Sequence, residues 1–142
     1  MRFRGEYEHT VDPKGRVSLP AKFRKELPDD VVIVPGFGGA LYVFSDDAFD
    51  AWVDSFFSQK EGGYNPRDAK DRNFRKRINA SAESVAVDAA GRVKLSSKLM
   101  QRGNIGKDVT IIGDDDHIEI WNRAAWNEFE DDTASLDEFL EA

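Results

Sequence analysis

Residues 11–23 read VDPKGRVSLPAKF, and residues 87–99 read VDAAGRVKLSSKL. The two stretches align at an offset of 76, and seven of their thirteen positions are identical. A match of this quality inside one chain indicates a duplicated structural unit. We therefore interpret the fold as two copies of one unit.

The similarity extends beyond these stretches. Residues 31–34 align with residues 109–112, and residues 41–44 align with residues 118–121. The chain is then divided into four predicted segments. These are a first unit at 5–47, a helix, linker and basic helix at 48–80, a second unit at 81–124, and a helix with an acidic C-terminal tail at 125–142.

Each unit is predicted to contain a strand, a tight turn, a second strand, a short helix and two further strands. In the first turn, Pro13 suits a position whose φ lies near −65°, and Gly15 suits the left-handed residue that follows. Asp88 and Gly91 repeat this turn chemistry without the proline. The expected short helices run from Pro20 to about Leu27 and from Ser96 or Ser97 to Gly103.

A unit of this size has too little core to fold alone. The two units are therefore expected to interleave their strands or to pair with another copy. The predicted fold class is α+β, mainly β.

The segment between the units is predicted to hold two helices. Ser45 is a typical N-cap residue, and apolar residues recur after it at helical spacing. We interpret this stripe as core or as a subunit contact that a monomer would expose. Asn65 and Pro66 are expected to open a basic helix that reaches Ile78. The stripe consists of Phe49, Trp52, Val53 and Phe56, and Trp126 and Phe129 form a shorter one after the second unit.

Composition favours a soluble globular protein of the cytoplasm. The 142 residues are 40% hydrophobic and 33% charged, and no apolar run approaches the ~20 residues of a membrane span. Cysteine is absent, which excludes disulfides and thiolate chemistry. The net charge of −7 is unevenly distributed, since residues 64–113 hold eleven Lys/Arg against five Asp/Glu and residues 114–142 hold one against eleven. An acidic total therefore does not exclude a local DNA-binding surface.

The two turns share an Asp-x-x-x-Arg pattern, with Asp12 and Arg16 in the first and Asp88 and Arg92 in the second. Residues so spaced flank a tight turn, and their side chains emerge together at its tip. In one interpretation the carboxylate only stabilises the turn and pairs with the arginine. In the other it orients the guanidinium toward a phosphate or the edge of guanine, and Lys14 adds a phosphate contact.

Together with residues 19–24 (LPAKFR) and the chain length, the duplicated turns resemble the MraZ family of bacterial transcription regulators. The resemblance covers nearly the whole chain and implies tandem SpoVT/AbrB-type units, which are swapped-hairpin β-barrels with short helices. It also implies a ring-shaped homo-oligomer, associated with the nucleoid, that binds repeated boxes in double-stranded DNA. Such proteins usually repress the division and cell-wall gene cluster. The candidate DNA-binding residues are Asp12, Lys14, Gly15, Arg16, Asp88 and Arg92.

The two loops are not expected to contribute equally. Pro13 restricts the first loop before binding, and Lys14 adds a cation to its tip. The second loop offers only Ala89 and Ala90 at these positions. We expect the first loop to dominate the DNA contact.

Two other functions compete with DNA binding. A metal-dependent enzyme would use the ligand types in Asp114, Asp115, Asp116 and His117, but consecutive residues of a turn point in different directions. The chain also contains no GxxxxGK[ST], HExxH or GxSxG motif. A protein-only oligomeric scaffold would instead use the Phe/Trp helices. We predict a regulator without catalytic residues, cofactor or metal, in which His117 is a turn residue.

Overall fold

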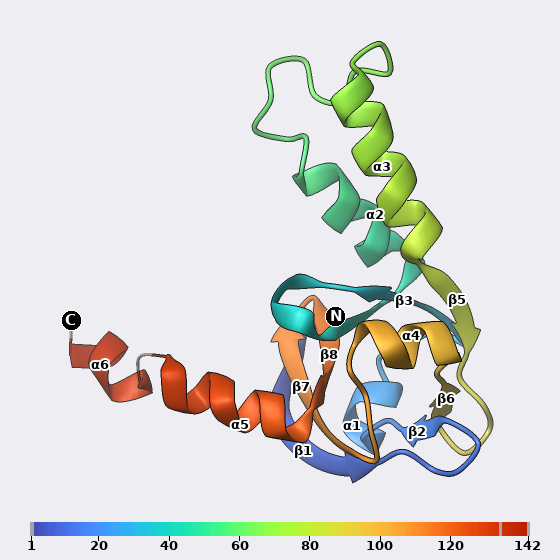
Figure 1. Cartoon of the computed structure of the whole chain (residues 1–142), viewed down its shortest axis with the longest axis vertical. Helices are drawn as coiled ribbons and strands as arrows, with labels where there is room; N and C mark the ends of the chain where they lie inside the picture. The colour runs from blue at the N-terminus through green and yellow to red at the C-terminus, as the bar shows by residue number, and fades with distance from the viewer. Residues whose placement is uncertain (1, 134, 142) are drawn as a thin grey trace.

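The computed structural model describes residues 2–133 and 135–141, which form a curved antiparallel sheet with short helices (Figure 1). This α+β, mainly β architecture confirms the predicted fold class. The described strands are β1 (Phe3–Thr10), β2 (Arg16–Ser18), β3 (Asp30–Pro35), β4 (Leu41–Phe44), β5 (Glu83–Ala86), β6 (Arg92–Lys94), β7 (Asp108–Asp115) and β8 (His117–Asn122). The helices are α1 (Ala21–Arg24), α2 (Asp46–Ser55), α3 (Ala69–Ser81), α4 (Ser97–Arg102), α5 (Arg123–Asp132) and α6 (Leu136–Glu141), with a short 3₁₀ helix η1 (Phe37–Gly39).

Strands of the two repeats are interleaved in a six-stranded sheet of order β1-β7-β8-β4-β3-β5, and β2 and β6 form a separate two-stranded ribbon. β1 pairs with β7, β3 with β5, and β4 with β8, all antiparallel. Every strand thus pairs with a strand of the other repeat. The expectation that the units interleave their strands is confirmed.

The strand register relates the repeats by a local two-fold axis. At the centre of the ribbon, Val17 lies opposite Val93, its own counterpart at the offset of 76. In the large sheet, Tyr42 lies opposite Glu119, again its counterpart in the aligned repeat. An antiparallel pair whose residues face their own counterparts is symmetric about that point, so the repeats place equivalent features on opposite sides of the axis.

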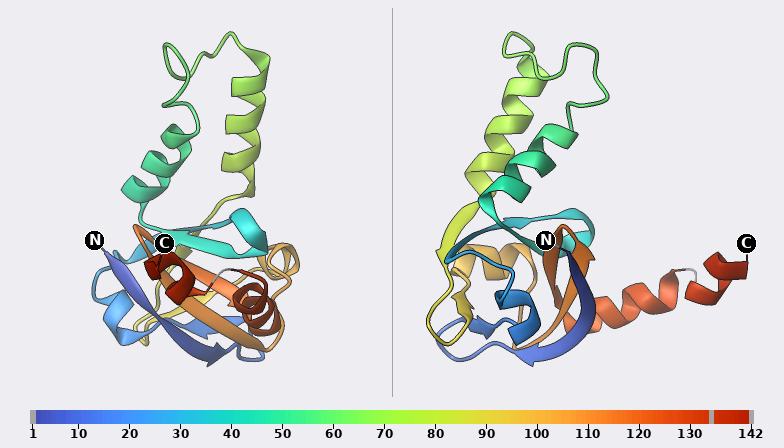
Figure 2. Two further views of the ribbon diagram at one scale, coloured as in Figure 1. Left: turned by 90° about the vertical axis from the view of Figure 1, so that its left-hand side faces the viewer. Right: turned by 180° about the vertical axis from the view of Figure 1, so that it is seen from behind.

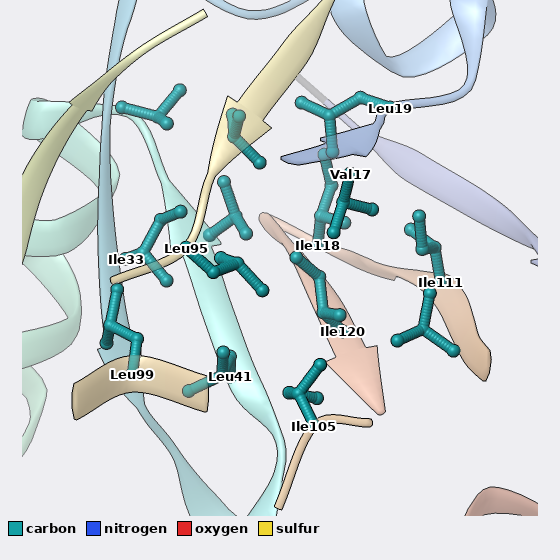
Figure 3. Packing of buried hydrophobic residues seen from close by; sticks show 14 of the residues in the cluster. Val17, Leu19, Ile33, Leu41, Leu95, Leu99, Ile105, Ile111, Ile118 and Ile120 are labelled. Atoms are coloured by element: carbon teal, nitrogen blue, oxygen red, sulfur yellow. The ribbon is translucent and has the colours of Figure 1, made fainter. Parts of the chain in front are cut away.

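The main core lies between the large sheet and the ribbon (Figure 3). Side chains alternate across a strand, so β3 places Val31 and Ile33 in this core and Val32 and Val34 in a second cluster on its other face. Burial of both faces explains why this strand is an unbroken apolar run. Figure 3 labels Val17, Leu19, Ile33, Leu41, Leu95, Leu99, Ile105, Ile111, Ile118 and Ile120 among the core residues.

Helix α2 covers the second cluster. Its N-cap is Ser45, as predicted, since the Ser45 hydroxyl accepts a hydrogen bond from the N–H of Ala48 at 3.2 Å. Phe49 and Val53 are buried beneath the helix. The interpretation of this stripe as core is confirmed for both residues. The expectation that a monomer would expose them is wrong, because the sheet has a second apolar face that α2 covers. Phe129 on α5 stays exposed.

Helix α3 begins at Ala69, later than the start predicted from Asn65 and Pro66. The Asp68 carboxylate accepts a hydrogen bond from the N–H of Lys70 at 2.9 Å and so caps the helix at this point. The residues before it form turns instead.

The short helices of the two repeats differ in length. α1 ends at Arg24, before the predicted Leu27, and the chain continues in turns. α4 matches its prediction, with Ser96 as N-cap and Gly103 directly after its last residue.

Two helical projections leave the body in different directions (Figures 1 and 2). The hairpin of α2 and α3 stands at one end, opposite the β2/β6 ribbon, while α5 and α6 extend to one side. Among the described residues, no helix has the length and apolar character needed to span a membrane.

Candidate nucleic-acid interface

The β2/β6 ribbon has one buried and one exposed face. Val17 and Val93 point into the core and are fully buried. Because side chains alternate along a strand, Arg16, Lys94 and Arg92 share the opposite, outer face, where Arg16 lies across from Lys94. Alternation of valine with polar residues in two short strands therefore places three cations on one surface.

The loop before β2 holds Asp12 and Arg16 in a compact arrangement. Oδ1 of Asp12 accepts hydrogen bonds from the N–H groups of Lys14 and Arg16, both at 2.9 Å. Oδ2 of Asp12 accepts a hydrogen bond from Nε of Arg16 at 2.6 Å. The turn also needs Gly15, whose φ of 81° lies in the left-handed region.

The loop before β6 repeats these contacts. Oδ1 of Asp88 accepts hydrogen bonds from the N–H groups of Ala90 at 3.0 Å and Arg92 at 2.8 Å. Oδ2 of Asp88 accepts a hydrogen bond from Nε of Arg92 at 2.8 Å. The shared Asp, Gly and Arg therefore produce the same local geometry in both repeats.

Each Asp–Arg pair leaves the outer edge of the guanidinium unused. Nε contacts the carboxylate, whereas the Nη groups of Arg16 and Arg92 donate to no protein acceptor within the described parts of the chain. The two side chains are 31% and 33% exposed. The carboxylate thus both closes the turn and fixes the plane of the arginine, so the two interpretations of the pattern are compatible.

Hydrogen bonding keeps both carboxylates ionised. The backbone N–H of Arg16 is the main cause that lowers the pKa of Asp12 below 3.8, and the guanidinium adds to the effect. The backbone N–H of Arg92 is likewise the main cause that lowers the pKa of Asp88. Each pair is consequently a charge-assisted hydrogen bond at neutral pH.

Main-chain hydrogen bonds attach each loop to the strand of the other repeat. The N–H of Leu95 donates to the carbonyl oxygen of Gly15 at 2.8 Å, and the N–H of Leu19 donates to that of Gly91 at 2.9 Å. The loops therefore extend the ribbon at its two ends. These hydrogen bonds fix the positions of the two Asp–Arg pairs relative to each other.

Sequence reasoning did not single out Arg24, which contacts the second loop. Its Nη1 donates to the carbonyl oxygen of Ala90 at 2.6 Å. The counterpart of Arg24 in the other repeat is Met100, whose Sδ lies beside Gly15 of the first loop. The premise that the second tip lacks a cation is therefore wrong. No local signal identifies this contact, because it joins residues 66 positions apart.

The structure brings together only part of the alternative ligand set of Asp114, Asp115, Asp116 and His117. His117 is not a turn residue, because it begins β8 and is buried. Its Nδ1 lies 2.8 Å from Oδ1 of Asp116, while Asp115 instead pairs with Arg2 at 2.6 Å.

A different group, Asp114, His117 and Glu119, has its potential ligand atoms within 4.8 Å of one another. Both oxygens of Glu119 are engaged, since Oε2 lies 2.8 Å from Nε2 of His117 and Oε1 accepts from Nε1 of Trp121 at 2.8 Å. Burial acts to lower the pKa of His117, but hydrogen bonds to Glu119 and Asp116 outweigh it and raise the pKa. An ion-pair network accounts for this cluster.

The outer face of the ribbon carries the side-chain types that contact nucleic acid in other proteins. The major groove of B-DNA admits a two-stranded β-ribbon, and arginine can bind guanine O6 and N7 or a phosphate there. The ribbon places Arg16 and Arg92 near its two ends with oriented Nη groups, and it places Lys94 across from Arg16.

Comparison with known proteins identifies relatives over nearly the whole chain. The family described as "MraZ protein, putative antitoxin-like" matches residues 2–71 and 78–141. The transcriptional regulator MraZ of Caldanaerobacter subterraneus subsp. tengcongensis is 38% identical over 138 residues, which is 96% of this chain and 93% of the relative. The transcriptional regulator MraZ of Mycoplasmoides gallisepticum is 34% identical over 139 residues, or 98% of this chain and 93% of the relative. Each of the two matched ranges contains one repeat.

Proposed function

Since the chain belongs to the MraZ family and is a transcriptional regulator, we propose that it binds double-stranded DNA sequence-specifically through the outer face of the β2/β6 ribbon. To the set expected from sequence we add Arg24, because it contacts the second loop. The proposed contacts are Asp12, Lys14, Gly15, Arg16, Asp88 and Arg92, together with Arg24.

The observation that supports this proposal is that the Asp carboxylates hold Arg16 and Arg92 through Nε and leave their Nη groups without a hydrogen bond to the described chain. A guanidinium that is held through Nε and free at Nη has lost orientational freedom before DNA arrives, so less entropy is lost on binding. Two such groups on one rigid ribbon can address two points of the duplex at once. A role limited to turn stability would not require the Nη groups to face solvent.

The charge distribution supports the choice of this surface. The chain carries a net charge of −7, yet the ribbon and its loops carry exposed or half-exposed Lys14, Arg16, Arg24, Arg92 and Lys94. The acidic residues after Asp114 repel the phosphate backbone, which disfavours approach of DNA to the C-terminal helices. Helix α3 at the opposite end is also basic, so charge alone does not select the ribbon; the oriented arginines of its loops favour it as the DNA contact.

We further propose that the protein acts as a ring-shaped homo-oligomer on repeated promoter boxes. One ribbon offers few contacts, and several ribbons joined in one assembly bind jointly through their effective concentration. In this role the protein would work in the cytoplasm at the nucleoid and repress the division and cell-wall gene cluster. It would need no catalytic residue, cofactor or metal.

Sequencing the genomic DNA fragments that the purified full-length chain retains would test the proposal. We expect enriched fragments with boxes repeated at regular spacing, and tighter binding to several boxes than to one. The matched control is the double variant Arg16→Ala/Arg92→Ala, which should enrich no sequence while remaining folded by circular dichroism. Equal recovery of random fragments by both proteins would contradict the proposal.

A further inference from the structure

The C-terminal helix α6 carries an apolar face that no part of the described chain covers. Leu136, Phe139 and Leu140 recur at helical spacing and are 72%, 68% and 76% exposed. The remaining residues of the helix are acidic: Asp137, Glu138 and Glu141. A short helix with three large apolar side chains in water is typical of a segment that docks on another surface.

A groove of complementary character lies between the α2–α3 hairpin and α4. It encloses about 500 Å³, a volume within the ~300–1,000 Å³ typical of binding pockets. Its apolar lining includes Phe37 and Phe74, which are 63% and 40% exposed. Its rim is basic, with Arg77, Lys98 and Arg102.

The two surfaces match in both polarity and charge. Helix α6 offers three apolar side chains and three carboxylates, and the groove offers an apolar lining and three cations. Within the described residues, Arg77, Lys98 and Arg102 form no ion pair, so these charges are available to an acidic partner.

The chain's own α6 points away from its own groove. In both figures α5 and α6 extend to one side of the body, whereas the α2–α3 hairpin rises from another (Figures 1 and 2). Helix α5 is anchored to the sheet, because Trp126 and Phe129 pack on Trp121. We infer that α6 of one subunit docks in the α2–α3–α4 groove of a second copy of this chain.

Such a contact is head-to-tail, because the donated helix and the accepting groove are different surfaces. Each subunit donates one helix and offers one groove, so the contact repeats from copy to copy and closes when the rotation between copies completes a circle. This inference rests on the homo-oligomer of the proposed function and assigns the surfaces that would join its subunits. The ribbon lies opposite the α2–α3 hairpin and stays free for DNA.

Cysteine cross-linking in the full-length chain tests the contact, since the natural sequence contains no cysteine. The variant Leu136→Cys/Ala80→Cys places one thiol on α6 and one in the groove lining. Oxidation should produce a ladder of dimers, trimers and larger species on a non-reducing gel. Only an internally cross-linked monomer, or no cross-link, would overturn the inference.

The matched control moves the second thiol out of the groove. Lys76 is exposed on the same helix as Ala80 but does not line the groove. Leu136→Cys/Lys76→Cys should cross-link at least tenfold less efficiently. Equal efficiency in the two variants would show random collision and would also overturn the inference.

A second measurement separates this inference from the proposed function. Phe139→Asp should reduce the assembly mass measured by light scattering, whereas Phe139→Leu should preserve it. A wild-type monomer would contradict the proposed oligomer as well as the docking. An oligomeric wild type whose mass is unchanged by Phe139→Asp would overturn the docking alone. Binding of the protein to DNA with a single box would then still test the proposed DNA contact.

Discussion

Arg24 of the first repeat donates a hydrogen bond from Nη1 to the carbonyl oxygen of Ala90, at the tip of the second repeat's loop. The counterpart position in the other repeat holds Met100, which lies beside Gly15. The first loop has Lys14 at its tip, and the second has Arg24 packed against it. The two loops are therefore each supplied with a cation, from different sources.

Arg16→Ala is expected to weaken binding to a multi-box DNA by at least tenfold. The substitution would remove the proposed bidentate contact, worth about 1–3 kcal/mol, from every subunit of the proposed assembly. Mobility-shift titration measures the effect, with circular dichroism and sizing to show that the variant is folded and oligomeric. Arg16→Lys, which keeps the charge but loses the planar fork, should retain part of the affinity. Parental affinity in a folded Arg16→Ala would mean that the first loop does not face DNA.

Arg24→Ala and Lys14→Ala are expected to weaken DNA binding by similar amounts. Each removes one exposed cation at the tip of one loop, Lys14 from within the loop and Arg24 from α1 beside it, so each should reduce the slope of log K against log salt by about 0.9 if that cation neutralises one phosphate. Fluorescence anisotropy across a salt series gives the slopes. Lys25→Ala, next to Arg24 but outside the loops, serves as the control. An unchanged slope for Arg24→Ala would exclude that residue from the interface.

Gly15→Ala is expected to destabilise the fold by about 1–2 kcal/mol, the usual cost of a left-handed conformation in a residue with a side chain. The φ of Gly15 is 81°, and an added Cβ would lie 3.0 Å from the carbonyl oxygen of Leu95. Urea denaturation measures the change. Gly106→Ala is the control, because an added Cβ there meets no atom within 4 Å. Equal stability of the two variants would contradict the strained turn.

Stability is expected to depend on the protonation of His117. The pKa of His117 in the folded state is raised above 6.5. Protonated His117 therefore contributes fully to the free energy of unfolding below pH 6.5, and this contribution is lost as the pH rises through the folded-state pKa. Thermal unfolding between pH 6 and pH 9 should show a falling midpoint in the parent. His117→Gln should remove this dependence, and an NMR titration should place the midpoint of His117 above 6.5. A midpoint below 6.5 would contradict the ion pair with Glu119.

Local chemistry made the hairpin loops predictable. Asp12, Gly15 and Arg16 act within five residues of one another, so turn preferences and spacing were enough to indicate their arrangement. The duplication also predicted the second loop, and the small core of one repeat predicted that strands of the two repeats would pair. Both the fold class and the N-cap at Ser45 followed from patterns of this kind.

Other features depend on which residues the fold brings together. Phe49 and Val53 are buried because α2 covers the second face of β3 and β4. Helical spacing predicted the apolar stripe but left open whether the same chain or another subunit covers it. His117 is buried because β8 places it beside Glu119 and the ring of Tyr42.

The amino-acid sequence by itself determined the duplicated unit, its turns and the Asp–Arg pairs, because these depend on contacts between residues close in the chain. Tertiary structure alone decided that Arg24 lies at the second loop and that the outer face of the ribbon joins cations from both repeats. It also decided that α6 and the groove face different directions. These relations join residues distant in sequence, and only the packing of strands and helices around the shared core fixes their positions.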